Sequence, residues 1–207
     1  MYKITIIMPV YNQDNLVERA LNSLPLEKDY QYIIIDDGST DNSWQKIIDW
    51  YAKVENKIGR SIIMRWQNNE GVAKAMNFGF DFAEGEYIVS LSSDDYYIKD
   101  FKAFLPYLNG INDLVYFDLE INSGEVWHLD RESKEKYVGA VKFIRKEFLG
   151  DIRVPDLKWY EDVPFSKMLY DKKPVEAFTG IVLKHYNYPN EGSLTWQANN
   201  EKEKNEA

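Results

Sequence analysis

Two hydrophobic patterns alternate along the first half of the chain. Short runs that are apolar on both faces indicate buried parallel strands. The segments between them place apolar residues at helical spacing and indicate amphipathic helices. The predicted strands lie in residues 3–10, 32–35, 61–66 and 85–97, and the predicted helices in residues 16–24, 44–51 and 72–83. This βαβαβαβ order predicts a parallel sheet with right-handed crossovers.

The second half of the chain has a less regular pattern. It predicts a short helix at 101–108, two strands at 113–121 and 125–129, a helix at 162–170 and a strand at 175–183. Residues 138–144 are expected to be extended, with a helix running to Leu149 as the alternative. The sequence shows no linker, which favours one domain over residues 1–196 and a frayed polar tail over 197–207.

Composition and charge narrow the class of protein. The chain has 207 residues, a net charge of −9, no cysteine and two histidines. An acidic chain has no general attraction for nucleic acid or anionic membranes. The absence of cysteine excludes disulfides and thiolate metal sites, and two histidines are too few for a histidine-built zinc centre. No apolar run approaches the ~20 residues that span a bilayer, and the N-terminus does not resemble a signal peptide.

Two adjacent carboxylates, Asp94 and Asp95, follow the apolar run at 87–91. The end of a central strand in an open α/β sheet is a common ligand site, and paired oxygen ligands there suit a divalent cation shared with phosphates. Asp residues also commonly close strands as solvated turns. The pair alone does not decide between these two interpretations.

Dinucleotide and P-loop sites are disfavoured by the first turn of the chain. A dinucleotide-binding fold needs G-x-G-x-x-G after the first strand, and here that turn reads PVYNQD, without glycine. A nicotinamide oxidoreductase is therefore not expected.

Four motifs occur in order at the expected strand ends: MPVYNQ, DDGSTD, NEGVAKAMNFG and GEYIVSLSSDDYY. Together they resemble the signatures of family 2 glycosyltransferases, which have the GT-A fold. The resemblance covers roughly the first half of the chain, and four motifs in register are a specific signal. It implies a single α/β domain of GT-A type, with a mostly parallel Rossmann-like sheet and a smaller, less regular C-terminal acceptor region. Residues 1–97 would form the nucleotide-sugar-binding half and 98–196 the acceptor-binding half.

The resemblance also implies the residues that bind the nucleotide-sugar donor. They are Pro9, Val10, Tyr11, Asp37, Gly71, Lys74, Ser92, Ser93 and Asp94. Tyr11 would stack on the base, and Asp37 would accept a hydrogen bond from a base N–H, because a carboxylate only accepts. Asp36 or Asp37 could instead hold the local turn, and Lys74 could be a solvated helix residue rather than a phosphate contact.

The metal motif departs from the family pattern at one position. Asp94 and Asp95 are the expected ligands of Mg²⁺ or Mn²⁺, which would stabilise the diphosphate leaving group. The family pattern has a carboxylate two positions before Asp94, where this chain has Ser92. Met76 also stands where many relatives carry a basic residue. These departures leave the strength of metal binding open.

In the second half, WYEDVPF at 159–165 resembles the family motif that supplies the general base. The resemblance makes Asp162 the catalytic base and places Trp159, Tyr160 and Glu161 at the acceptor. A single base fits an inverting displacement, since a covalent double displacement needs a nucleophile as well. The alternative is that the two acids only stabilise a helix start through the helix dipole. His185 is a candidate phosphate contact.

The resemblance thus implies an inverting, cytoplasmic glycosyltransferase, peripheral to the inner face of the membrane. It would use a nucleotide-diphospho-sugar, with UDP as the expected nucleotide, and a saccharide or lipid-linked saccharide acceptor in surface polysaccharide synthesis. Two alternatives stay open: a sugar-nucleotide-binding protein without turnover, which Ser92 favours, and a nucleotidyltransferase of related fold, which the Glu-Asp motif disfavours.

Overall fold

The computed structural model describes residues 2–58, 61–157 and 160–190. Over these residues one nine-stranded sheet runs through the molecule, in the order β3-β2-β1-β4-β8-β6-β9-β5, with β7 paired to β6. The elements of the first half are β1 (Tyr2–Val10), α1 (Val17–Asn22), β2 (Tyr30–Asp36), α2 (Ser43–Ile58), β3 (Ile62–Trp66), α3 (Val72–Phe82) and β4 (Gly85–Ser90).

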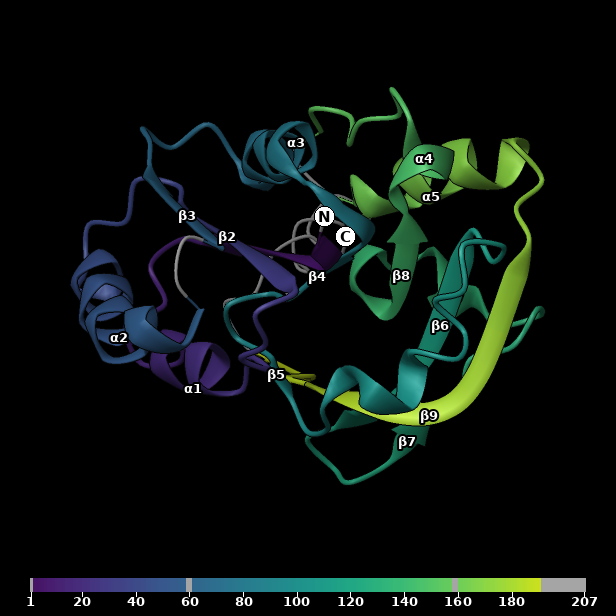
Figure 1. Ribbon diagram of the computed structural model, residues 1–207, viewed down its shortest axis with the longest axis horizontal. Helices are drawn as coiled ribbons and strands as arrows, with labels where there is room; N and C mark the ends of the chain where they lie inside the picture. Colours follow the sequence, from purple (N-terminus) through teal and green to yellow (C-terminus); the bar gives the residue numbers. More distant parts are fainter. Residues whose placement is uncertain (1, 59–60, 158–159, 191–207) are drawn as a thin grey trace, which may run out of the picture.

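The first half forms the parallel part of the sheet. β1 pairs in parallel with both β2 and β4, and β2 pairs in parallel with β3. Helices α1 and α2 lie on one side of these strands and α3 on the other (Figure 1). β2 is buried along its whole length, and its central run, residues 32–35, is apolar on both faces, as the sequence pattern predicted. The predicted parallel sheet with helices on both faces is confirmed.

Helix α3 lies unusually close to β1 at Gly79. A Cβ atom built on Gly79 would come within 2.5 Å of Cγ2 of Ile7. Only glycine permits this approach, which seats α3 against the centre of the sheet. The loop before α3 is thereby held beside the ends of β1 and β2.

The second half extends the sheet with mixed pairings. Its elements are β5 (Tyr96–Tyr97), η1 (Phe101–Phe104), β6 (Leu114–Ile121), β7 (Val126–Trp127), η2 (Lys134–Tyr137), η3 (Gly139–Val141), β8 (Lys142–Arg145), α4 (Lys146–Leu149), α5 (Asp162–Asp171) and β9 (Glu176–Tyr186). β8 is antiparallel to β4 and β6, whereas β9 runs parallel to β6. Figure 1 shows β9 as a long curved strand along one edge of the molecule. Its far end pairs with β5 and so returns to the segment that carries the acidic pair.

Several predicted bounds in this half are wrong. The helix predicted at 101–108 is only the 3₁₀ turn η1, because Pro106 lacks the N–H that a longer helix needs. The strand predicted at 125–129 is the two-residue β7, since the Asp118 carboxylate takes the N–H of Leu129 at 3.0 Å. Residues 138–149 form η3, β8 and α4 in succession, so each alternative holds for part of the segment. The predicted tail at 197–207 lies outside the described residues.

Candidate functional site

A cavity of about 460 Å³ opens at the carboxyl ends of β1, β2 and β4. The start of α5 and the end of β9 contribute its other walls. It brings together the following residues predicted for the site: Pro9, Val10, Tyr11, Asp37, Gly71, Ser92, Ser93, Asp94, Asp95, Glu161 and Asp162. Residues from both halves of the chain therefore share one cavity.

Tyr11 follows β1 and is 47% exposed, so one part of its ring is open to a ligand. The neighbouring acids Asp36 and Asp37 have different contacts. Asp36 is fully buried, and its Oδ1 accepts a hydrogen bond from the Ser39 N–H at 2.8 Å. Burial raises the pKa of the Asp36 carboxyl. Asp36 therefore holds the local turn.

Asp37 fixes the loop between β3 and α3. Its Oδ1 accepts from Nε2 of Gln67 at 2.8 Å and from the Glu70 N–H at 3.0 Å, and its Oδ2 accepts from the Gly71 N–H at 2.8 Å. Gly38 has φ 77°, and a Cβ atom there would lie 2.7 Å from the Asn69 nitrogen. The loop can lie against the β2 turn because residue 38 is glycine.

Asp94 and Asp95 also have different environments. Asp95 is 0% exposed, and its Oδ2 accepts from Nζ of Lys184 at 2.8 Å. Its Oδ1 accepts from the Asn187 N–H at 2.9 Å. Asp94 lines the cavity, and its Oδ2 accepts from Nδ2 of Asn190 at 2.9 Å. Burial, and then the charge of Asp95, raise the pKa of the Asp94 carboxyl.

These contacts bear on metal binding. In the described part of the chain, no three histidine, aspartate or glutamate side chains gather into a group that could hold a metal ion by themselves. Mg²⁺ sites that share substrate phosphates need only one or two protein carboxylates. Asp94 fits that role, whereas both oxygens of Asp95 already have protein donors. The arrangement suits a cation held by Asp94 and a diphosphate.

Another wall of the cavity is formed by the start of α5. Asp162 is the first residue of the helix, and Glu161 occupies the N-cap position without a side-chain capping bond. Both line the cavity that Asp94 lines. Burial, and then the charge of Asp162, raise the pKa of the Glu161 carboxyl. Tyr160 is 45% exposed with φ 55°. Trp159 lies outside the described residues.

Two predicted donor contacts do not line this cavity. Lys74 is on α3 with an exposed side chain, and its Nζ lies 3.7 Å from Oδ2 of Asp156. The ring of His185 stacks on Tyr96 with centroids 4.6 Å apart. The buried Nδ1 of His185 has no hydrogen-bond partner among the described residues. Phosphate contacts by these two side chains stay predictions.

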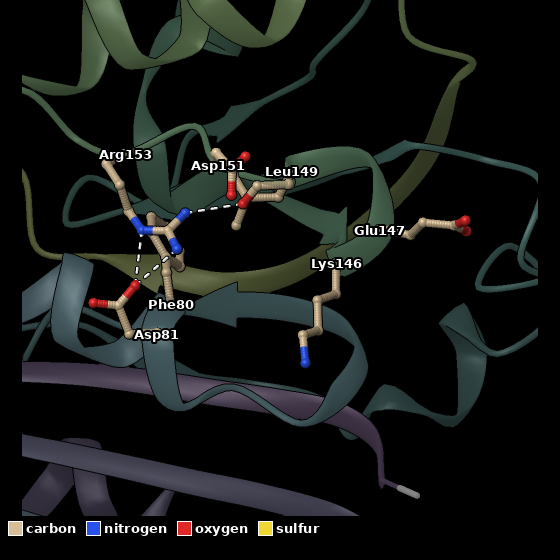
Figure 2. Close-up of a pocket in the computed structure, with 8 residues that line it drawn as sticks. Phe80, Asp81, Lys146, Glu147, Leu149, Asp151 and Arg153 are labelled. Carbon is tan, nitrogen blue, oxygen red and sulfur yellow. Dashed lines mark hydrogen bonds and ion pairs between the residues drawn. The ribbon is translucent and has the colours of Figure 1, made fainter.

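A second cavity, of about 410 Å³, lies between α3 and α4. Figure 2 shows the Arg153 guanidinium directed at Asp81, and the Nη2–Oδ1 distance is 2.7 Å. Nη1 of Arg153 also donates to the carbonyls of Gly150 and Ile152. The cationic group of Arg153 is thus engaged in holding the segment before α5 on α3.

Residues 5–176 match the family model described as "Glycosyl transferase family 2". The chain belongs to this family. The family predicted from the four motifs is therefore confirmed. A curated relative, the poly(ribitol-phosphate) beta-glucosyltransferase of Bacillus spizizenii, is 38% identical over 98 residues, which is 45% of this chain and 15% of the relative.

Solved structures of the family share the fold. S. aureus TarS in complex with UDP-GlcNAc superposes with a TM-score of 0.77 at 22% identity, over 93% of this chain and 60% of that one. The mannosyltransferase PcManGT of Pyrobaculum calidifontis, in complex with GDP-Man and Mn²⁺, gives 0.73 at 16% identity, over 95% and 61%. The chain spans only 15% to 30% of the length of the curated relatives that it matches most strongly. Within the described residues, every helix is too short or too polar to cross a bilayer.

Sequence reasoning missed two buried lysines of the site. Lys142 and Lys184 are each 1% exposed, and both line the cavity. Lys142 lies inside the apolar run AVKFI, in a segment predicted to be extended, and Lys184 follows the apolar run IVL, one residue after the strand predicted at 175–183. A lysine inside a buried strand needs a partner, and this signal could have identified both residues as part of the site.

Proposed function

We propose that this chain transfers a sugar from a nucleoside-diphospho-sugar to an acceptor hydroxyl with inversion at the anomeric carbon. One observation carries the proposal: Asp94 and Asp162, from the two halves of the chain, line the same cavity. Tyr11 and Asp37 line it as well. Membership of glycosyl transferase family 2 supports the same reaction.

The donor would lie along the ends of β1, β2 and β4. Tyr11 would stack on the base, since its ring is half exposed at the cavity. The Oδ2 atom of Asp37 accepts from the Gly71 N–H and, as a carboxylate oxygen, can accept a second donor from the base. UDP is the proposed nucleotide, because the similar TarS structure holds UDP-GlcNAc.

The chemical step needs an acceptor for one proton. The carboxylate of Asp162 takes the proton of the acceptor hydroxyl while that oxygen attacks the anomeric carbon, and the diphosphate leaves from the opposite face. When bound at Asp94, Mg²⁺ or Mn²⁺ supplies charge neutralisation of the diphosphate. Glu161 stands beside the base and, with Tyr160 and Trp159, would orient the acceptor.

The acceptor is proposed to be a surface-polymer hydroxyl or a lipid-linked saccharide. A relative acts on poly(ribitol-phosphate), as its name states, which supports a polymer acceptor. The proposed place of the reaction is the cytoplasm or the inner face of the membrane.

The proposal is tested by incubating the purified chain with UDP-glucose, UDP-GlcNAc or GDP-mannose, with Mn²⁺ or Mg²⁺, and with saccharide and polyol-phosphate acceptors. Release of the nucleoside diphosphate together with a product of inverted anomeric configuration, read by NMR, supports it. The Asp162→Asn variant is the matched control and should bind the donor without turnover. Tight donor binding without release in the native chain would favour instead a sugar-nucleotide-binding protein, the alternative that Ser92 keeps open.

A further inference from the structure

A buried lysine is part of the wall of the cavity that Asp162 also lines. Lys142 is the first residue of β8 and is 1% exposed. Its Nζ donates to the carbonyls of Lys136 and Val138, each at 2.9 Å, and to Oγ of Ser166 at 3.0 Å. All three acceptors are uncharged. The ammonium therefore joins the segment around η2 to helix α5.

Ser166 places this contact directly below the candidate base. It is 0% exposed and lies four residues after Asp162, so both side chains share one face of α5, one turn apart. The Ser166 hydroxyl donates in turn to the carbonyl of Tyr137 at 2.7 Å. Lys142 and Ser166 together tie the first turns of α5 to η2, which fixes where the helix begins.

The charge of Lys142 also acts on this end of the helix. Burial lowers the pKa of Lys142 to about 7, while the negative charges of Asp162 and then Glu176 act in the opposite direction. The interaction is mutual, so a protonated Lys142 favours the ionised form of Asp162. Two other described groups lie near this pair. The charge of Glu161, at the same helix start, interacts with that of Asp162. The ring centroid of Tyr116 lies 5.8 Å from Nζ of Lys142.

We propose that Lys142 is a positioning residue for Asp162: it fixes the start of α5 at the cavity wall and holds the Asp162 carboxyl in its ionised form. The proposal deepens the proposed function, because it assumes that Asp162 acts there as the base. Ionised Asp162 can take the proton of the acceptor hydroxyl, whereas protonated Asp162 cannot. Lys142 itself touches neither the donor nor the acceptor in this role.

The first test does not depend on turnover. The chain is labelled with ¹³C at the aspartate carboxyl, the Asp162 signal is assigned by its loss in Asp162→Asn, and its titration is followed by NMR. In Lys142→Met the pKa of Asp162 should rise, since an opposite charge that acts on it has been removed. Lys172→Met is the matched control, because Nζ of Lys172 also donates to a carbonyl, that of Phe148, but at the far end of α5. It should leave the titration unchanged.

The second test separates position from charge. Ser166→Ala removes the link to α5 and leaves the lysine charge in place. It should lower kcat for nucleoside diphosphate release about tenfold at an unchanged donor KM, with little change in the Asp162 titration. Lys142→Met should lower kcat further and move the acid limb of the pH profile to higher pH. Lys172→Met should keep the native kcat and profile.

An Asp162 titration in Lys142→Met that matches the native chain would overturn the proposal. If Lys142→Met does not fold, Lys142→Gln keeps a hydrogen-bond donor, removes the charge and is judged by the same titration. If the native chain shows no turnover, the proposed function fails, but the titration still decides whether Lys142 controls Asp162. The two failures are thereby distinguishable.

Discussion

Replacing Asp95 by asparagine tests whether Asp95 is a structural residue or a metal ligand. Asp95 and its neighbour Asp94 were both predicted as ligands, but the Asp95 side chain is 0% exposed and its Oδ2 lies 2.8 Å from Nζ of Lys184. The Lys184 side chain is 1% exposed. Asp95→Asn leaves that ammonium buried without its negative partner. We therefore expect a large loss of stability and an intact route for metal binding at Asp94.

The magnitude follows from the burial of both partners. Water does not screen this pair, so the surface value of about 0–1 kcal/mol does not apply. Breaking a buried pair by removing one partner costs about 3–5 kcal/mol. A domain has a free energy of unfolding of roughly 5–15 kcal/mol, so Asp95→Asn should remove about a fifth of it or more. Adding Lys184→Met to Asp95→Asn should recover part of the loss, because no unpaired charge then remains.

Urea unfolding at neutral pH, followed by circular dichroism, measures these differences. The matched control is Glu86→Gln, which breaks the partly exposed pair between Glu86 and Lys3 at 2.6 Å and should cost about 1 kcal/mol or less. Calorimetry with UDP and Mn²⁺ is run on the same variants. If Asp95→Asn were as stable as the native chain and had lost Mn²⁺-dependent binding, Asp95 would be a ligand and the reasoning would be refuted.

Three further outcomes are expected. Asp162→Asn should lower kcat for nucleoside diphosphate release by roughly 10²–10⁴-fold with little change in donor affinity, whereas Glu161→Gln should lower kcat less. If both variants lowered kcat by the same small factor, Asp162 would not be the base. In calorimetry, Asp94→Asn should abolish Mn²⁺-dependent UDP binding, and Ser92→Asp should leave that binding equal or tighter. The metal binds the ionised carboxylate, and the pKa of Asp94 is raised. As the pH falls, Mn²⁺-dependent binding by the native chain should therefore be lost at a higher pH than it would be with an exposed aspartate as the ligand. Asp37→Ala should weaken UDP binding about fivefold or more, because it removes the bond to the base and also the three bonds that hold the loop before α3; unchanged affinity in a folded variant would count against base recognition.

The parallel half of the fold could be predicted because its local signals agree. Apolar runs mark β1, β2 and β4 as covered on both faces, and helical spacing marks α2 and α3. The second half depends on contacts between distant residues. The strand β8, for example, is stabilised by its pairing with β4 and β6. The four residues 142–145 are too few for their hydrophobic pattern to predict that pairing.

The site was predictable to the level of motifs. The motifs correctly indicated that acids after β4 and at the start of α5 would share a cavity with residues after β1 and β2. Lys74 shows the limit of that reasoning, since its position in a matching motif did not reveal that its side chain lies near Asp156 and away from the cavity. Side-chain direction at a helix surface depends on what packs beside it, and sequence spacing alone does not contain that.

In two acidic doublets, Asp36–Asp37 and Asp94–Asp95, the two carboxylates have different environments, and the difference originates outside the doublet. Lys184, from β9, engages Asp95 and leaves Asp94 at the cavity. The loop before α3 engages Asp37, while Asp36 holds its own turn. Two adjacent carboxyl groups disfavour each other's ionisation. A cation or a set of N–H donors beside one of them stabilises its charged form, so both acids can be accommodated at adjacent positions. A motif search finds such doublets, but the role of each acid is decided by a buried lysine or a loop far along the chain. In this chain, a buried lysine in or next to an apolar run, such as Lys184, is therefore the residue to place before roles are assigned to the acids of the cavity.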